Sequence, residues 1–312
     1  MISIGLYGTN GHQIHKHPAL GKNFEIAAVA EWNGEVPSGA KRYETLKEII
    51  ADESIELVSL CSPVRALQAE EAITCLEAGK HVYAEKPCAL NERDLDRIIE
   101  AAQKSGKIFH EMAGTAFEQP WHSMMKLVAA GAVGEVIQVR AQKSYPYHER
   151  RPQDENIDGG LFTQVGVHAA RFVEHVAGVK IKTIRAIETR LGNPSEDGGL
   201  KMASACVIEL ENGGVASFIA NYLNPPAFGL WGNESLRIFG SKGFIEATDG
   251  GVKTRLVTNE KDFGGIDVSQ PAPDYFEMFL DEIEGKTMAP LSIWDELHPT
   301  RMVVRAKRAL EG

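Results

Sequence analysis

The chain has 312 residues, of which 43% are hydrophobic and 24% charged, as in a globular protein of about two domains. Its net charge of −10 and the lack of a basic stripe exclude the electrostatic footprint of a nucleic-acid-binding protein. No apolar run reaches the roughly 18 residues of a membrane span, and no secretory signal precedes the first strand, so we expect a cytoplasmic protein.

The first 110 or so residues alternate apolar strands with helical segments, a pattern typical of a doubly wound parallel sheet. Strands are expected at residues 2–7, 24–30, 56–61, 81–84 and 108–112. Helices are expected from the turn after the first strand to about Leu20, and at 43–51, 66–78 and 92–105. The pattern predicts an α/β fold whose N-terminal Rossmann dinucleotide-binding domain spans residues 1–118.

After Pro120 longer strands of alternating polarity replace this pattern, expected at 135–141, 183–189, 203–211, 215–221, 236–239 and 244–247. Asn212-Gly213-Gly214 between two of these strands is a strong hairpin signal. Helices are expected at 121–130, around 274–284 and at 294–310. We predict a C-terminal α+β domain, residues 119–312, with a large, mostly antiparallel, open sheet. Its uncovered face predicts a homodimer or homotetramer formed through that sheet.

Few residues of this chain suggest a metal or a disulfide. The four cysteines are scattered without Cys-x-x-Cys spacing, which predicts reduced thiols. His12, His15 and His17 are close in sequence, but only the first two share a helix face and no carboxylate joins them. We therefore expect no metal site.

The turn after the first strand is a partial dinucleotide fingerprint. Gly8 fills the first position of Gly-x-Gly-x-x-Gly, while Asn10 and Gln13 stand at the second and third. Because Asn tolerates positive φ and Gly11 is adjacent, we expect the turn to survive and to bind a cofactor. The candidate cofactor contacts here are Gly8, Thr9, Asn10 and Gly11.

An acidic residue supports the same site. Glu31 lies at the end of the second strand, 20 residues after Gly11, where a carboxylate binds the ribose hydroxyls of a dinucleotide. Its charge would repel a 2′-phosphate, which favours NAD over NADP. Ser62 and Pro63 follow the third apolar strand and are expected at the rim of the cofactor site.

The run Glu85-Lys86-Pro87 places a lysine at the carboxyl end of a short buried strand. In an open parallel sheet that end is where ligands bind. Pro87 cannot donate to a sheet ladder, so it ends the pairing and stiffens the backbone that carries Lys86. We expect Glu85 and Lys86 to lie at the cofactor and substrate site.

With this run, the chain resembles the Gfo/Idh/MocA oxidoreductase family over nearly its whole length. The other segments that carry the resemblance are Ala78-Gly79-Lys80-His81-Val82, Gly131-x-x-Gly134-Glu135-Val136, Gly159-Gly160, Gly166-x-His168, residues 238–243 and the closing helix. The resemblance implies bound NAD or NADP and usually dimers or tetramers. It also implies that Lys86 is the catalytic lysine and His168 the catalytic histidine. His168 would take the proton of an alcohol and Lys86 would bind the developing oxyanion, while the hydride passes to the nicotinamide.

The chain departs from the family pattern at Gln164, where many members carry an aspartate four residues before the histidine. Glutamine can hydrogen-bond the imidazole but cannot stabilise an imidazolium by charge, so we expect it to orient rather than ionise. Further candidate contacts for a polyol lie in polar loops, where function concentrates. They are Tyr145, His148, Arg150 and Tyr222.

These observations predict an oxidoreductase that uses NAD(P), with NAD favoured over NADP. Its substrate is expected to be a sugar, inositol or related polyol. Two alternatives stay open. An enzyme that retains its NAD could cleave a glycosidic bond by transient oxidation. A non-catalytic nucleotide-binding regulator would account for the missing aspartate at Gln164.

Overall fold

The computed structural model describes residues 1–311 and divides into two compact units. Unit 1 comprises residues 1–113, 156–159 and 275–301, and unit 2 comprises 114–155, 160–274 and the chain from 302 onward. The domain division at 118/119 stays a prediction, but the packing assigns 275–301 to the first unit, a return of the chain that local sequence patterns do not indicate. Among residues 1–311, no helix is both long and apolar enough to cross a membrane.

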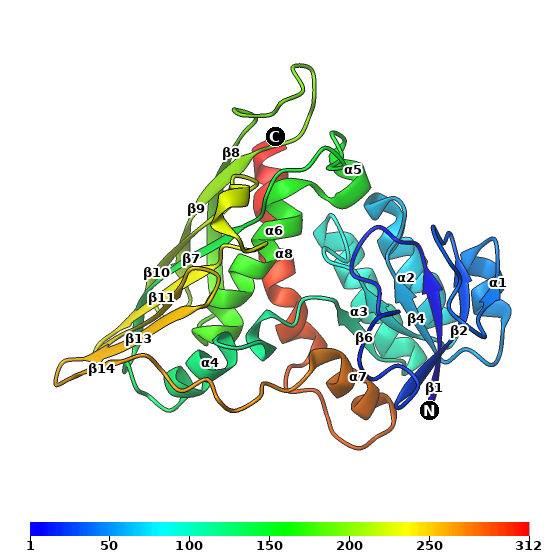
Figure 1. Ribbon diagram of the computed structural model, residues 1–312, viewed down its shortest axis with the longest axis horizontal. Helices are drawn as coiled ribbons and strands as arrows, with labels where there is room; N and C mark the ends of the chain where they lie inside the picture. The colour runs from blue at the N-terminus through cyan, green and yellow to red at the C-terminus, as the bar shows by residue number, and fades with distance from the viewer. Residues whose placement is uncertain (312) are drawn as a thin grey trace. The chain divides into compact units, whose positions relative to one another are not determined.

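Unit 1 is built on a six-stranded parallel sheet in the order β3-β2-β1-β4-β5-β6 (Figure 1). Its strands are β1 (Ile2–Tyr7), β2 (Phe24–Ala30), β3 (Lys41–Arg42), β4 (Leu57–Leu60), β5 (His81–Ala84) and β6 (Phe109–Glu111). Its helices are α1 (Leu46–Ala51), α2 (Gln68–Glu77), α3 (Glu92–Ser105) and α7 (Tyr275–Ile283), with a 3₁₀ turn at Arg65–Leu67. The strand order is that of a dinucleotide-binding fold, so the predicted fold class is confirmed.

Local sequence explains α3 at both ends. The Asn91 side chain accepts a hydrogen bond from the amide of Asp94, and Gly106 ends the helix at φ +65°. Leu95 and Ile98 recur on one face and are buried. A polar cap, a C-terminal glycine and 3.6-residue periodicity therefore agree with one another, and the expected range is confirmed.

The helix expected between the first strand and about Leu20 is wrong, because residues 8–23 form turns. The amide of His17 donates to the carbonyl of Ile14 at 2.9 Å, and that of Leu20 to the carbonyl of His17 at 3.0 Å. Pro18 lacks the N–H that a helix needs and its ring would collide with the carbonyl of Ile14. The proline is therefore incompatible with a regular helix that runs from the turn to Leu20.

The Gln13 side chain binds backbone carbonyl groups in the segment where that helix is expected to begin. Its Nε2 donates to the carbonyl oxygens of Tyr7 at 3.1 Å, Gly8 at 2.9 Å and Ser59 at 3.2 Å. The Ser59 hydroxyl donates back to Gln13 Oε1 at 2.7 Å. One amide side chain thus satisfies carbonyl groups at the ends of β1 and β4, which a glycine at this position could not do.

A buried histidine attaches residues 275–301 to the edge strand β6. His110 Nδ1 lies 2.5 Å from Glu296 Oε2, and its Nε2 lies 3.0 Å from Glu282 Oε2. The second oxygen of Glu296 accepts the amide of Glu111 at 2.7 Å. Burial acts to lower the pKa of His110, but the two carboxylates outweigh it and raise the pKa to about 9.

Unit 2 is built on an eight-stranded sheet in the order β14-β13-β12-β11-β7-β10-β9-β8, in which β7 and β10 are parallel and the other neighbours antiparallel. Its strands are β7 (Val136–Ser144), β8 (Ile181–Thr189), β9 (Ala203–Leu210), β10 (Val215–Asn221), β11 (Ser235–Gly240), β12 (Gly243–Thr248), β13 (Lys253–Thr258) and β14 (Asp262–Gly264). The helical elements are α4 (Trp121–Ala129), α6 (Gly160–Arg171), 3₁₀ turns at Thr115–Phe117 and Pro226–Phe228, a π-helical segment at Phe172–Val176, and α8 (Ile293–Glu311), which begins in unit 1 and ends in this unit. The short helix α5 (Glu155–Asp158) begins in this unit and continues into unit 1. The mostly antiparallel sheet is as predicted.

Helices cover one face of this sheet, with α6 lying along β7 and β10 (Figure 1). Phe162 of α6 stacks on Phe218 of β10 with ring centroids 5.7 Å apart. Among the described residues no helix covers the other face, where Ile187, Val207 and Ile219 are exposed. The sheet is therefore open, as expected.

Candidate active site

Lys86 directly follows β5, at the carboxyl end of the parallel sheet, where its position was expected. Its side chain is only 3% exposed, and its Nζ lies 3.7 Å from Oε1 of the equally buried Glu85. The peptide bond between Lys86 and Pro87 is cis. The lysine is thus a buried cation beside a carboxylate.

Glu85 binds the turn that follows β1. Its Oε2 accepts the amide of His12 at 2.7 Å and lies 2.9 Å from His12 Nδ1. Its carbonyl oxygen accepts Gln68 Nε2 at 2.5 Å. Burial acts to raise the pKa of Glu85, but His12 and then Lys86 outweigh it and lower the pKa to about 2. The carboxylate is therefore charged at neutral pH.

The other expected cofactor contacts lie along the same edge of the sheet. A Cβ on Gly8, at φ +73°, would stand 2.1 Å from the carbonyl oxygen of Cys61, so only glycine fits there. Thr9 Oγ1 accepts Asn33 Nδ2 at 3.3 Å. Glu31 is exposed directly after β2 at φ +49°. Its carboxylate is available to solvent where the fingerprint places the ribose.

Asn10 bonds three carbonyl groups of unit 1 through one side-chain amide. Its Nδ2 donates to the carbonyl of Ile157 at 2.6 Å and to those of Ser62 and Pro63 at 3.3 Å each. The Ser62 hydroxyl in turn donates to Glu71. Burial is the main cause that raises the pKa of Glu71. Ser62 and Pro63 thus lie against Asn10 shortly after β4, and their contact with a cofactor stays a prediction.

These residues fit a dinucleotide in part. Glu31 and the strand ends suit its adenosine side, since they offer a carboxylate and close backbone approach. The diphosphate position requires backbone amides at the turn, and the His12 amide donates to Glu85. With residues 8–23 in turns, no helix begins there to add its dipole.

In unit 2, α6 is buried except at Gln164 and His168, which are half-buried and share one face of the helix. Gln164 Oε1 accepts the hydroxyl of Tyr222 at 2.8 Å, and His168 Nδ1 lies 3.0 Å from Thr115 Oγ1. Tyr222 is 1% exposed, and the guanidinium of Arg151 stacks 3.6 Å from its ring centroid. Tyr222 therefore positions Gln164 in this arrangement.

Thr115 was not found from the sequence. It lies 53 residues before His168, in a 3₁₀ turn rather than a motif, and only the tertiary structure brings its hydroxyl to the imidazole. A hydroxyl can accept from or donate to Nδ1, so it selects the ring orientation without adding charge.

Three other expected substrate contacts lie in loops of unit 2. The rings of Tyr145 and His148 lie 6.2 and 6.0 Å from that of the exposed Trp231, with His148 stacked on it. The buried ammonium of Lys143 lies 5.4 Å from the Tyr145 ring centroid. Arg150 is exposed in the adjacent turn. The aromatic rings form one surface, whereas Arg150 offers its charge to solvent.

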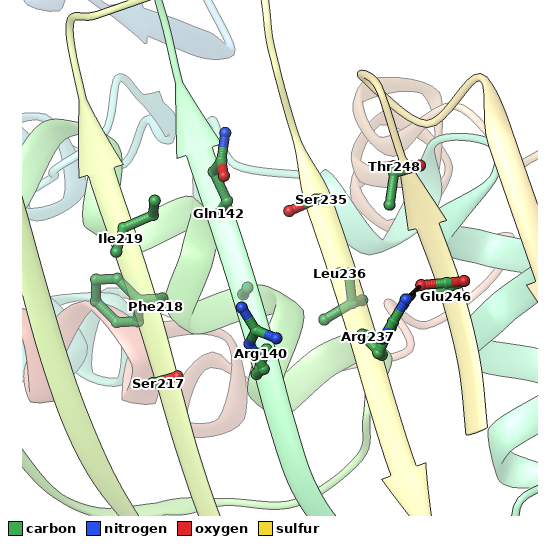
Figure 2. A pocket seen from close by; sticks show the side chains of 11 residues that line it. Arg140, Gln142, Ser217, Phe218, Ile219, Ser235, Leu236, Arg237, Glu246 and Thr248 are labelled. Carbon is green, nitrogen blue, oxygen red and sulfur yellow. Dashed lines mark hydrogen bonds and ion pairs between the residues drawn. The ribbon is translucent and has the colours of Figure 1, made fainter. Parts of the chain in front are cut away.

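The open face of the sheet has a hollow of about 260 Å³ (Figure 2), and none of the candidate site residues lines it. Arg140 and Arg237 are register partners on β7 and β11, and the Arg237 side chain is directed to Glu246, to which its Nε donates at 2.5 Å. The remaining lining residues are Ala141, Gln142, Ser217, Phe218, Ile219, Ser235, Leu236 and Thr248. The hollow is a feature of the open face, separate from the candidate active-site residues.

A Rossmann-type sheet with a buried lysine at a strand end, joined to an open-sheet unit with a half-buried histidine, defines a two-unit oxidoreductase. The chain belongs to the Gfo/Idh/MocA family. Residues 7–112 match its model described as an oxidoreductase family with an NAD-binding Rossmann fold, and residues 121–246 match the GFO/IDH/MocA C-terminal domain. The chain is therefore a member of a family of oxidoreductases.

Similar proteins agree with this assignment. The chain is 25% identical over 248 residues to a myo-inositol 2-dehydrogenase of Thermotoga maritima, covering 78% of this chain and 72% of the relative. It is 29% identical to an uncharacterised oxidoreductase of Rhizobium meliloti, covering 55% and 56%. A solved structure described as an oxidoreductase of Thermotoga maritima matches with a TM-score of 0.87 and 26% identity, covering 99% of this chain and 98% of the other.

Proposed function

We propose that the protein is an NAD-dependent dehydrogenase that interconverts a CH–OH group and a carbonyl in a sugar, inositol or related polyol. The observation that carries this proposal is Lys86, a buried cation at the carboxyl end of β5 in a Rossmann-type sheet. The similarity to a myo-inositol 2-dehydrogenase supports the substrate class. When bound, the nicotinamide supplies the hydride acceptor. Glu31 favours NAD because a carboxylate repels a 2′-phosphate.

The chain's own residues divide the acid–base work. In the proposal, Lys86 donates hydrogen bonds to the substrate oxygen as its negative charge develops. His168 accepts the hydroxyl proton on its imidazole, which the Thr115 hydroxyl orients through Nδ1 at 3.0 Å. Gln164 orients the imidazole of His168 without ionising, and the Tyr222 hydroxyl donates to Gln164 Oε1 at 2.8 Å. The aromatic surface of Tyr145, His148 and Trp231 suits the apolar face of a sugar ring.

The experiment that tests the function is a panel of inositols, aldoses and related polyols with NAD and NADP, followed by the absorbance of the reduced nicotinamide. We expect turnover with at least one polyol and a preference for NAD. Release of sugar from a glycoside without net reduced cofactor would instead show the glycosidase chemistry. Saturable NAD binding with no turnover on the whole panel would favour the regulator.

Gln164 allows a direct test of the missing aspartate. Gln164→Glu is nearly isosteric and places a carboxylate one helical turn from His168. An opposite charge favours the imidazolium, so the ascending limb of the pH profile of kcat/KM should move upward by about one pH unit. The expected measurement is kcat/KM between pH 5 and 10 for both proteins.

Tyr222→Phe is the matched control, since it removes the hydroxyl that donates to Gln164 without adding charge. We expect it to lower kcat/KM severalfold and leave the pH profile in place. An unmoved profile in Gln164→Glu would exclude His168 as the group that the profile reports.

We also propose that two copies pair through the open sheet face. Val207 points outward from β9 and is 64% exposed, on the same face as the exposed Ile187 and Ile219, and exposed apolar side chains that gather on one face mark interaction surfaces. A buried charge there would oppose association, so Val207→Asp should convert a dimer to a monomer in light scattering. Leu191→Asp is the control, because Leu191 is 84% exposed and lies outside the strands. A wild-type monomer at micromolar concentration would refute the pairing.

A further inference from the structure

The space that a side chain at Gly11 would occupy is filled by the carboxylate of Glu85. A Cβ built on Gly11, at φ +154°, would stand 2.5 Å from Cγ and 2.6 Å from Oε2 of Glu85. In a dinucleotide fingerprint the glycine whose missing Cβ admits the pyrophosphate is the second one, a position that Asn10 holds here, next to Gly11. At Gly11 the corresponding space holds the carboxylate of Glu85.

The carboxylate also uses the donors that a phosphate would use. Glu85 Oε2 accepts the His12 amide at 2.7 Å, and both of its oxygens lie within 3.2 Å of His12 Nδ1. A charged carboxylate at a backbone amide is the contact that a phosphate oxygen makes in such turns. Glu85 is thus an internal substitute for a phosphate.

We propose that the contact between Glu85 and His12 is a latch that closes the diphosphate position of the turn, so that a dinucleotide binds only after the carboxylate has left the His12 amide. The inference rests on the proposed NAD-dependent function. NAD and Glu85 then compete for one donor, and the observed affinity is the intrinsic affinity reduced by the fraction of open turns.

Further hydrogen bonds hold the turn after β1 in its closed arrangement. Asn10 Nδ2 donates to the carbonyl of Ile157 at 2.6 Å, and the carbonyl of Asn10 accepts Arg65 Nη2 at 2.5 Å. The chain on both sides of Gly11 is therefore tied to other segments of unit 1. Lys86 and Arg65 stay beside Glu85 when it leaves His12, so the opened carboxylate keeps cationic neighbours.

The test compares Glu85→Gln with Glu71→Gln by calorimetric titration of NAD and of inorganic pyrophosphate. Glu85→Gln keeps the size of the side chain and removes the charge that makes the latch strong. We expect this variant to lower the Kd of both probes about tenfold, which is about 1.4 kcal/mol. Glu71 lies at the same sheet edge but bonds Tyr7 and Ser62 rather than the turn, so its variant should change Kd by less than about twofold.

The outcomes separate the latch from the function. Equal gains in the two variants, or an unchanged Kd in Glu85→Gln, would overturn the latch and leave the dehydrogenase standing. No NAD binding by the wild type and by Glu85→Gln would overturn both. Stopped-flow mixing of the wild type needs no variant: the observed rate should level off with rising NAD as opening becomes limiting. A rate that stays linear up to saturation would count against the latch.

Discussion

Lys86→Ala should lower kcat/KM by about a thousandfold, because a charged donor aimed at a developing oxyanion contributes differentially to the transition state. The ammonium is buried beside Glu85, where a charge acts with little screening by water. Initial rates of reduced-nicotinamide formation on the best polyol from the panel measure the loss. The dissociation constant of NAD, from fluorescence titration, should change far less than the rate.

Lys104→Ala is the matched control, since Lys104 is an exposed lysine on α3 that pairs with Glu100. Its loss should leave kcat/KM unchanged. Lys86→Arg distinguishes charge from geometry: it keeps a cation beside Glu85 but moves the donors, so we expect most of the loss to remain. Wild-type turnover in Lys86→Ala would contradict the assigned role.

The second large effect concerns stability. His110→Ala leaves the carboxylates of Glu282 and Glu296 facing a site from which their shared cation has gone. Removing one partner of a buried ion pair costs about 3–5 kcal/mol, because the remaining charge stays buried without compensation. The free energy of unfolding in urea at pH 6.5 should fall by about that amount.

The same cluster predicts how stability depends on pH. The pKa of His110 is raised to about 9 by the two carboxylates, against an ordinary value of 6.5. Its contribution is therefore fully present below pH 6.5 and is lost as the pH rises toward 9. The wild type should lose stability in this interval, whereas His110→Ala should lack that part of the loss.

His81 on the neighbouring strand provides the control with the opposite sign. Burial is the main cause that lowers its pKa to about 4, and its Nδ1 accepts the amide of Ile108 at 3.0 Å. Its contribution is present above pH 6.5 and falls as the pH drops toward 4. His81→Ala should cost about 1 kcal/mol and keep the alkaline loss of stability. If stability depended on pH in the same way in His110→Ala and His81→Ala, His110 would be excluded as the source of the alkaline loss of stability.

Local sequence sufficed wherever several signals agreed on one segment. β5 and β10 have their expected ranges, because apolar runs there are bounded by glycine, proline or a hairpin turn. α3 has both caps that its sequence predicts. The helix predicted after β1 is wrong because Gln13 and Pro18 build a different structure: the Gln13 side chain binds carbonyl groups at the strand ends, and Pro18 lacks the N–H that a helix needs.

The candidate site divides in the same way. Lys86 and His168 could be named from motifs, since each sits in a short run with a recognisable spacing. Thr115 could not, because a hydroxyl 53 residues from His168 has no pattern of its own. The environment of Tyr222 also required the structure: its loop suggested a substrate contact, and the structure shows it buried with its hydroxyl donating to Gln164.

The sequence by itself determined the alternation of strands and helices, the family and the lysine at the end of β5, because these depend on residues adjacent in the chain. Only the tertiary structure decided what occupies the turn after β1. The partners of that turn, Glu85 and Ile157, come from 73 and 147 residues away from His12 and Asn10, and their contacts arise when the chain folds back on itself. Hydrogen bonds and buried charges of this kind are set by proximity in space, which local patterns do not encode.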